Sequence, residues 1–199
     1  MFAYCGNNPV RRSDTQGTDW TDILNGGLDV LEWLVDTCES VGQNVDLCFV
    51  QCFSGNASPG AFDFVQSIAV VFDARGNIAI QGQPLTGGIT TNAAPSASFV
   101  ATSSIAFAPR YKDLEGKGYN LGGSYFSDYY GLGGGFDINL YENKKKDKVH
   151  FGMTASAGIG VPRGSGEVHA NWGDTYTIAH INIYRLLRKG IKVLRGKIK

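Results

Sequence analysis

The sequence contains no long apolar run. Among its 199 residues there is no stretch of about 20 consecutive apolar residues, which is the length that a transmembrane helix needs. Residues 1–30 also lack the basic segment and following apolar segment of a secretory signal peptide. We therefore expect any export signal to come from elsewhere.

Proline is scarce, and histidine pairs at metal-binding spacing are missing. Six prolines against 27 glycines, without a Gly-X-Y period, exclude a collagen-like chain and favour a β protein with many tight turns. Cys48 and Cys52 have no partner histidines at the spacing of a zinc site, so we expect no metal and no cofactor. The cysteines are expected to be reduced thiols, and the alternative is a bridge from Cys38 to Cys48 or Cys52.

Basic residues are concentrated at the C-terminal end. The chain has 18 Lys and Arg and 18 Asp and Glu, which gives a formal charge of zero. The last fifteen residues contain seven basic residues and no acidic one, so the rest of the chain is acidic. This asymmetry is typical of a segment that binds a membrane or nucleic acid. The alternative is that the tail folds back on the acidic rest of the chain.

The first seventeen residues carry a recognisable motif. Residues 1–10 read Met-Phe-Ala-Tyr-Cys-Gly-Asn-Asn-Pro-Val, and a polar stretch follows that ends at Gly17. This segment resembles the end of the core of the rearrangement-hotspot (RHS/YD-repeat) family, whose repeat shell closes with Tyr-Ala-Tyr-x-x-Asn-Asn-Pro-Val and an Asp-Pro-x-Gly junction. The matching positions are Phe2, Ala3, Tyr4, Asn7, Asn8, Pro9, Val10, Asp14 and Gly17. Thr15 departs from the pattern, because the family usually has proline there.

The resemblance implies a place in a larger protein. In the RHS family a variable C-terminal toxin follows the junction and is often released by self-cleavage near it. Residues 1–17 are thus expected to be a remnant of the RHS core and junction of a secreted or cell-surface parent protein. The implied partners are the parent RHS shell and a cognate immunity protein. Because Met1 lies inside the motif, we expect the chain to be a fragment or a detached tip.

Apolar residues recur at helical spacing over residues 19–39. Gly26 and Gly27 weaken the middle of this stretch by roughly 1 kcal/mol each relative to alanine. The sequence therefore predicts a shorter helix over residues 28–39, inside a linker of residues 18–44.

Beyond residue 45 the apolar pattern changes to a period of two, which is typical of strands. Eight or nine strands are expected over residues 45–184, with a turn at residues 73–76 and a loop at residues 82–96. Residues 97–184 are expected to form one continuous antiparallel sheet. The sequence therefore predicts an all-β fold, an antiparallel glycine-rich barrel or closed sandwich of about eight strands, with an N-terminal helix and a C-terminal basic amphipathic helix.

Glu167, His169 and Asp174 are the candidate catalytic residues. In a strand that begins near residue 166, Glu167 and His169 share one face, so the carboxylate can orient the imidazole for acid-base chemistry. No His-Glu-x-x-His or Gly-x-Ser-x-Gly motif accompanies them. The alternative is structural, because polar residues that alternate along a strand are what a wetted sheet face needs.

The tail, residues 185–199, has the pattern of a cationic amphipathic helix. Apolar residues recur at helical spacing, and basic residues occupy most of the remaining surface. Such a helix suits an anionic membrane surface. The residues predicted to bind that surface are Arg185, Arg188, Lys189, Lys192, Arg195, Lys199, Leu187, Ile191 and Leu194.

Three functions stay open at this point. The preferred one is the variable tip of an RHS-type protein, a toxin or effector domain in microbial competition that acts by membrane interaction and not by catalysis. The alternative is a nuclease or other enzymatic toxin that uses Glu167 and His169, although nucleic acid is the less favoured partner. The third is a non-toxic surface binding module.

Overall fold

The computed structural model describes residues 20–198 apart from residues 93, 129, 146 and 162–164. The RHS-like motif, Cys5, Thr15 and Lys199 lie outside the described residues. The chain divides into a β unit, residues 42–182, and a helical unit that contains α1 and α2. Each unit is described by itself.

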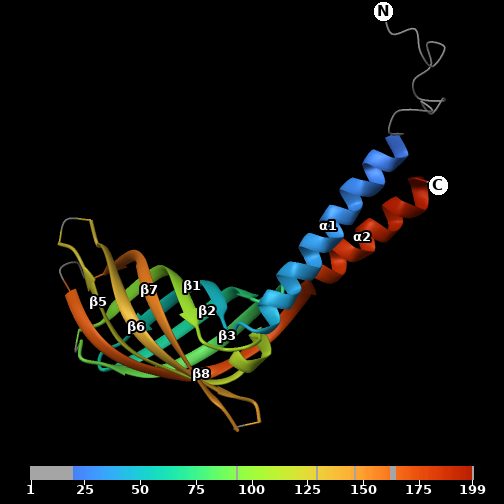
Figure 1. Ribbon diagram of the computed structural model, residues 1–199. Coiled ribbons are helices and arrows are strands. Elements are labelled where there is room, and N and C mark those ends of the chain that lie inside the picture. Colours follow the sequence, from blue (N-terminus) through green and yellow to red (C-terminus); the bar gives the residue numbers. More distant parts are fainter. Residues whose placement is uncertain (1–19, 93, 129, 146, 162–164, 199) are drawn as a thin grey trace, which may run out of the picture. The chain divides into compact units, whose positions relative to one another are not determined.

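The β unit is a closed antiparallel barrel of eight strands, which confirms the predicted fold class (Figure 1). The strands follow the ring order β1-β2-β3-β8-β5-β6-β7-β4, and β4 closes the ring by pairing with β1. The five strands β4 to β8 are adjacent in this ring, so the predicted continuous sheet over residues 97–184 is also confirmed. The strands are β1 (Cys48–Ser58), β2 (Phe62–Asp73), β3 (Asn77–Thr90), β4 (Ser96–Ala106), β5 (Gly116–Phe126), β6 (Leu132–Asn143), β7 (Val149–Val161) and β8 (Ser165–Asn182).

Two expectations about the strands were wrong. Residues 82–90 were expected in a loop, but β3 continues through them to Thr90. They pair with β2 on one side and with β8 on the other, and a register shift between Gly82 and Gly87 accommodates Pro84. Similarly, residues 167–172 and 175–184 were expected as separate strands, but they belong mainly to one strand, β8.

The ring order shows two Greek keys. Within β1 to β4 the fourth strand returns to lie beside the first, and within β5 to β8 the eighth strand returns to lie beside the fifth. The connection from β4 to β5 must therefore pass over two intervening strands at one rim. It contains the short 3₁₀ helix η1 (Tyr111–Leu114). We call this end the η1 rim, and the opposite end, where β1 ends, the far rim.

The barrel core lies inside the η1 rim. Tyr111 and Leu114 of η1 are buried there against apolar residues of the strand ends. The rest of this apolar cluster is Cys48, Val50, Val71, Ala79, Ala106 and Ala108. The connection between β4 and β5 thus fills one mouth of the barrel.

The helical unit is an antiparallel pair of helices, α1 (Trp20–Gln43) and α2 (Ile183–Ile198), which lie side by side (Figure 1). Leu28 and Val35 of α1 and Ile191 of α2 are buried. The predicted helix over residues 28–39 was too short, because α1 continues through Gly26 and Gly27. Burial and ion pairing along α1 offset the intrinsic cost of these two glycines.

Candidate functional site

The barrel wall places its polar and apolar residues on opposite faces. In β7, for example, Phe151 and Met153 are exposed on the outside, while Thr154 is buried on the inside. The same alternation occurs in the other strands, so the predicted apolar face of residues 149–159 points away from the barrel interior. Polar side chains line the lumen, and the wall presents phenylalanine, isoleucine, leucine and valine to its surroundings.

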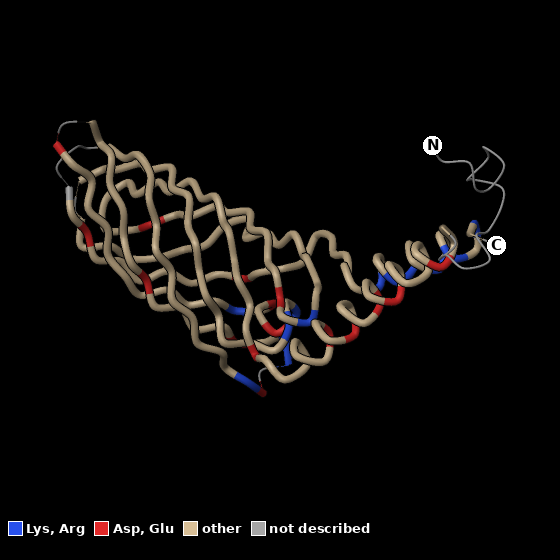
Figure 2. The backbone as a smooth tube through the Cα atoms, turned by 45° about the horizontal axis from the view of Figure 1, so that its top comes forward, with Lys and Arg blue, Asp and Glu red and all other residues tan. Residues whose placement is uncertain are grey.

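The outer face has almost no charge. Among the described strand residues, the charged side chains on this face are Lys117, Glu142 and Asp174. They are neighbours, since Lys117 pairs with Glu142 on β6 and with Asp174 on β8, and all three lie next to the η1 rim. From there to the far rim the described outer face is an uncharged band, and Figure 2 shows how sparse charged residues are along the strands.

The lumen contains a cavity of about 130 Å³. Its lining is mostly small and polar, with serine, threonine, asparagine and glutamine from all eight strands. An eight-stranded barrel is just wide enough for ordinary side chains to fill it. The cavity exists because so many of the inward positions hold small residues.

Inside the lumen, a histidine lies between two carboxylates. His169 Nε2 lies 2.9 Å from Asp137 Oδ1, and His169 Nδ1 lies 3.6 Å from Glu167 Oε1. Glu167 also accepts hydrogen bonds from Thr90 Oγ1 at 3.1 Å and from Ser124 Oγ at 3.2 Å. The five residues come from β3, β5, β6 and β8, which are neighbours in the order β3-β8-β5-β6, so this strand order brings them together.

Gly122 makes this contact geometrically possible. It lies on β5 between Asp137 of β6 and His169 of β8, and it is paired with both. A Cβ atom at Gly122 would overlap Asp137 Oδ1. Because glycine leaves this inward position empty, the imidazole and the carboxylate meet across the strand that separates them.

Several polar atoms of the lumen have no partner. Asn171 lies two residues from His169 on the same strand and is 7 % exposed, and its Oδ1 atom accepts no hydrogen bond. His169 Nδ1 also lacks a hydrogen bond, because 3.6 Å is too long for one. By contrast, Thr154 is held by Asn139 and Ser104 at 2.6 Å each. Asn56 Oδ1 on β1 and His150 Nε2 on β7 are unpaired as well, so the unpaired atoms are not confined to the surroundings of His169.

The structure assembles two of the three predicted catalytic residues. Glu167 and His169 share the inward face, as expected. Asp174 lies on the outward face of the same strand and is exposed, so it does not join them. Sequence reasoning missed Asp137, the closest partner of His169. Its inward position follows from the alternation of β6, but its pairing across β5 needed the strand order.

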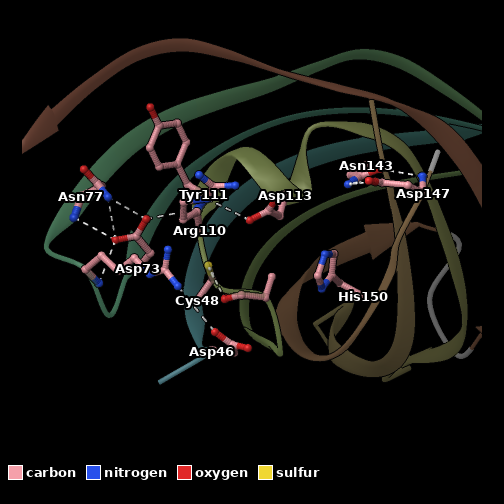
Figure 3. A network of polar contacts seen from close by, with 12 residues as sticks. Asp46, Cys48, Asp73, Asn77, Arg110, Tyr111, Asp113, Asn143, Asp147 and His150 are labelled. Atoms are coloured by element: carbon pink, nitrogen blue, oxygen red, sulfur yellow. Dashed lines mark hydrogen bonds and ion pairs between the residues drawn. The ribbon is translucent and has the colours of Figure 1, made fainter. Parts of the chain in front are cut away.

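A second polar network closes the η1 rim (Figure 3). Asp73 accepts hydrogen bonds from the backbone amides of Arg75, Asn77 and Tyr111, at 2.9 to 3.2 Å. Gln81 Nε2 donates to the carbonyl of Tyr111 at 2.9 Å, and the Tyr111 ring stacks on His180. These contacts hold η1 in the barrel mouth from three neighbouring strands, β2, β3 and β8.

Glu115 anchors the end of the same connection. Its carboxylate pairs with Lys144 Nζ at 2.7 Å. Partial burial alone would raise the pKa of Glu115, but hydrogen bonds from Lys144 and Thr177 outweigh burial and leave this pKa below its usual range. The ionised form of Glu115 is therefore the one that the folded rim stabilises.

The predicted membrane-binding tail is the helix α2, and part of its charge is already paired. Arg188 contacts Asp36 and Glu39 of α1, and Arg195 contacts Asp29 and Glu32. The two acids beside Arg188 raise its pKa further. Of the predicted apolar residues Ile191 is buried, whereas Leu187 and Leu194 are exposed. Lys189 and Lys192 make no ion pair within the described part of the chain.

The described residues include no group of three or more His, Cys, Asp or Glu arranged to hold a metal ion. Cys38, Cys48 and Cys52 are free thiols. Neither α1 nor α2, as far as they are described, has the length and apolar character needed to cross a membrane. The chain matches no family model, no curated protein and no solved structure.

Proposed function

We propose that the chain is the variable, membrane-acting tip of an RHS-type effector, and that its β-barrel is the part that enters the lipid bilayer. The RHS assignment rests on the motif in residues 1–17. The membrane assignment rests on the barrel, and the sequence had placed it on the C-terminal tail instead.

The outer face of the barrel carries the proposal. A water-soluble monomer rarely exposes contiguous apolar patches larger than a few hundred Å². Here every strand exposes large apolar side chains, and the three outward charges of the described strands are confined to one rim. An apolar outer band around a polar interior is the arrangement of membrane-spanning barrels.

The strands are long enough for this role. A strand tilted across the hydrocarbon core needs about 9 to 11 residues. The shortest strands of the barrel, β1, β4 and β5, have 11 residues each. Closure also satisfies the backbone, because a ring of paired strands has no free edge to expose to lipid.

The helical unit supports a secondary role at the membrane surface. Within the described residues Lys189 and Lys192 make no ion pair, and Leu187 and Leu194 of the same helix are exposed. Basic and apolar residues together favour an anionic interface, at about 1 kcal/mol per basic residue near the surface. The paired Arg188 and Arg195 are expected to contribute less.

Vesicle insertion tests the proposal. The full chain is mixed with vesicles of neutral or partly anionic phospholipid, which are floated and then washed at alkaline pH. We expect the protein to remain with the washed vesicles and its barrel to resist added protease. A chain that stays monomeric and dispersed in buffer, with no vesicle-bound fraction under either lipid condition, would contradict the proposal.

A catalytic role is the second candidate, because the barrel does bring Glu167 and His169 together. If the pair catalyses a reaction, His169→Ala and Glu167→Ala should each abolish toxicity while the barrel stays folded. Full toxicity in both variants would remove this candidate. Nuclease activity can be assayed directly, by incubating purified protein with DNA or RNA.

A further inference from the structure

The ionisable groups inside the barrel are not explained by insertion alone. A barrel that only anchors a protein needs no charge in its lumen, and ionisable groups at membrane depth are costly and rare. Asp137, Glu167 and His169 nevertheless meet there, and Asp137 and His169 line the cavity of about 130 Å³. Within the described strands no Lys or Arg side chain faces the lumen.

We propose that the lumen is a proton pathway in which Asp137, His169 and Glu167 form the relay and the connection at residues 107–115 forms the seal. This inference rests on the proposed function, because a pathway needs a membrane to cross. Three observations carry it: the two carboxylates on opposite sides of one imidazole, the unpaired Asn171 oxygen beside them, and the polar cavity that Asp137 and His169 line.

The geometry allows a balanced proton transfer. A proton that arrives on the Glu167 carboxylate passes to His169 Nδ1, after a small rotation closes the 3.6 Å gap. The proton already on Nε2 passes to Asp137 across 2.9 Å, and Glu167 is a carboxylate again. Asp137 then releases its proton to water on the η1 side. The ring returns to its starting tautomer through cavity water, which takes the proton from Nδ1 and gives one to Nε2.

The cavity has room for hydrogen-bonded water molecules. At about 130 Å³ it holds a few water molecules, and each needs polar partners such as the unpaired Asn171 oxygen. Ser104 and Thr154 continue the polar lining, with their hydroxyl oxygens 2.6 Å apart. A proton moves along such hydrogen bonds without crossing the cavity as a hydrated ion, so the inference predicts a proton flux larger than the potassium flux.

The seal lies at the η1 rim. Beyond the polar stretch the lumen meets the apolar cluster that includes Val50, Val71, Tyr111 and Leu114. Water is excluded from such a cluster, so the relay ends there while η1 stays in the mouth. Gln81 and Asp73 hold Tyr111 in the mouth through hydrogen bonds to its backbone. When these bonds break and residues 107–115 move away, the pathway opens.

Proton flux into vesicles tests the inference. The full chain is reconstituted in vesicles that contain a pH-sensitive dye, with valinomycin and potassium to balance charge, and insertion is measured separately by flotation and protease protection. We expect Leu114→Ala, which loosens the seal, to raise proton flux several-fold over the unaltered chain. Gln81→Leu, which removes the hydrogen bond to Tyr111 and keeps the side-chain size, is the milder second variant if Leu114→Ala does not insert.

Two isosteric substitutions, each added to the Leu114→Ala variant, identify the relay. Asp137→Asn should return proton flux to the level of empty vesicles. Asp174→Asn removes the same charge from the outer face of the barrel and should leave the flux unchanged. Inserted, loosened protein without proton flux would overturn the inference, and so would equal passage of potassium and protons or equal loss in both variants. Protein that never inserts would refute the proposed function itself, and the pathway with it.

Discussion

The barrel and the helical unit differ in where they place apolar residues. The helices bury apolar residues, Leu28, Val35 and Ile191, and two arginines of α2 pair with acids of α1. The barrel keeps its polar residues inside and its apolar residues outside. Figure 2 shows the contrast, with many charged residues along the helices and few along the strands.

On the proposed function, the barrel is the unit that enters lipid. The helix pair is rich in charged residues, and it also exposes apolar residues such as Trp20, Leu31 and Trp33. A barrel wall that exposes uncharged apolar residues over most of its height is arranged for hydrocarbon. On this proposal, the cationic helix α2 is where the chain touches the membrane surface, and the outer face of the barrel is where it enters the bilayer.

The largest effect is expected from a charge placed in the uncharged band on the outer face of the barrel. Ile138 lies near the middle of β6 and faces outward. We expect Ile138→Lys to cost about 2 to 4 kcal/mol of stability in vesicles, because the ammonium would lie at the centre of the hydrocarbon. Val149→Lys, at the η1 rim beside Lys148, is the control and should cost about 1 kcal/mol or less. Equal stability of both variants in urea titrations would show that the outer face meets water.

The interior of the barrel is tested at Gly122. A methyl group there would overlap Asp137 Oδ1 and the carbonyl of Phe136. We expect Gly122→Ala to destabilise the barrel by about 1 to 3 kcal/mol, as overpacking generally does. Gly55→Ala is the control, because its Cβ atom would meet nothing within 4 Å. Similar denaturation midpoints for the two variants would contradict the close approach of Asp137 and His169.

The helical unit is tested by its unpaired lysines. We expect the double variant Lys189→Gln, Lys192→Gln to lose about 1 kcal/mol of affinity per lysine for anionic vesicles. Arg188→Gln should lose less, because Asp36 and Glu39 already neutralise this arginine. Co-sedimentation at rising salt measures both. A larger loss for Arg188→Gln would mean that the helix pair separates at the membrane.

The smallest expected effect concerns pH at the η1 rim. Because the folded-state pKa of Glu115 is lowered, its pairing with Lys144 stabilises the protein above the ordinary carboxyl pKa. This contribution disappears as pH falls through the lowered value. Lys144 is largely exposed, so we expect only about 0.2 to 1 kcal/mol. Thermal melts of Glu115→Gln should show that loss at pH 7 and none below the folded pKa, whereas an equal loss at both pH values would contradict this pairing.

Much of the fold could be predicted from the sequence, because period-two patterns depend on local alternation. The same alternation occurs in a barrel in water and in a barrel in lipid, so the direction in which the faces point could not be predicted. The contact of Asp137 with His169 depends on which strands are neighbours. Likewise, the pairing of Arg188 with Asp36 joins positions 152 residues apart, and no local pattern in α2 indicates it.

The two Greek keys have a consequence for how the barrel assembles. Six of the eight strand pairings join strands of the same half of the barrel, either residues 48–106 or residues 116–182. The halves meet along two seams, β3 with β8 and β4 with β7. Because closing a short segment costs less entropy than closing a long one, each four-stranded half can form first as a curved open sheet. Until the seams join, such a half has free edges, so we expect the polar interior to become sealed from its surroundings only in the last step of folding.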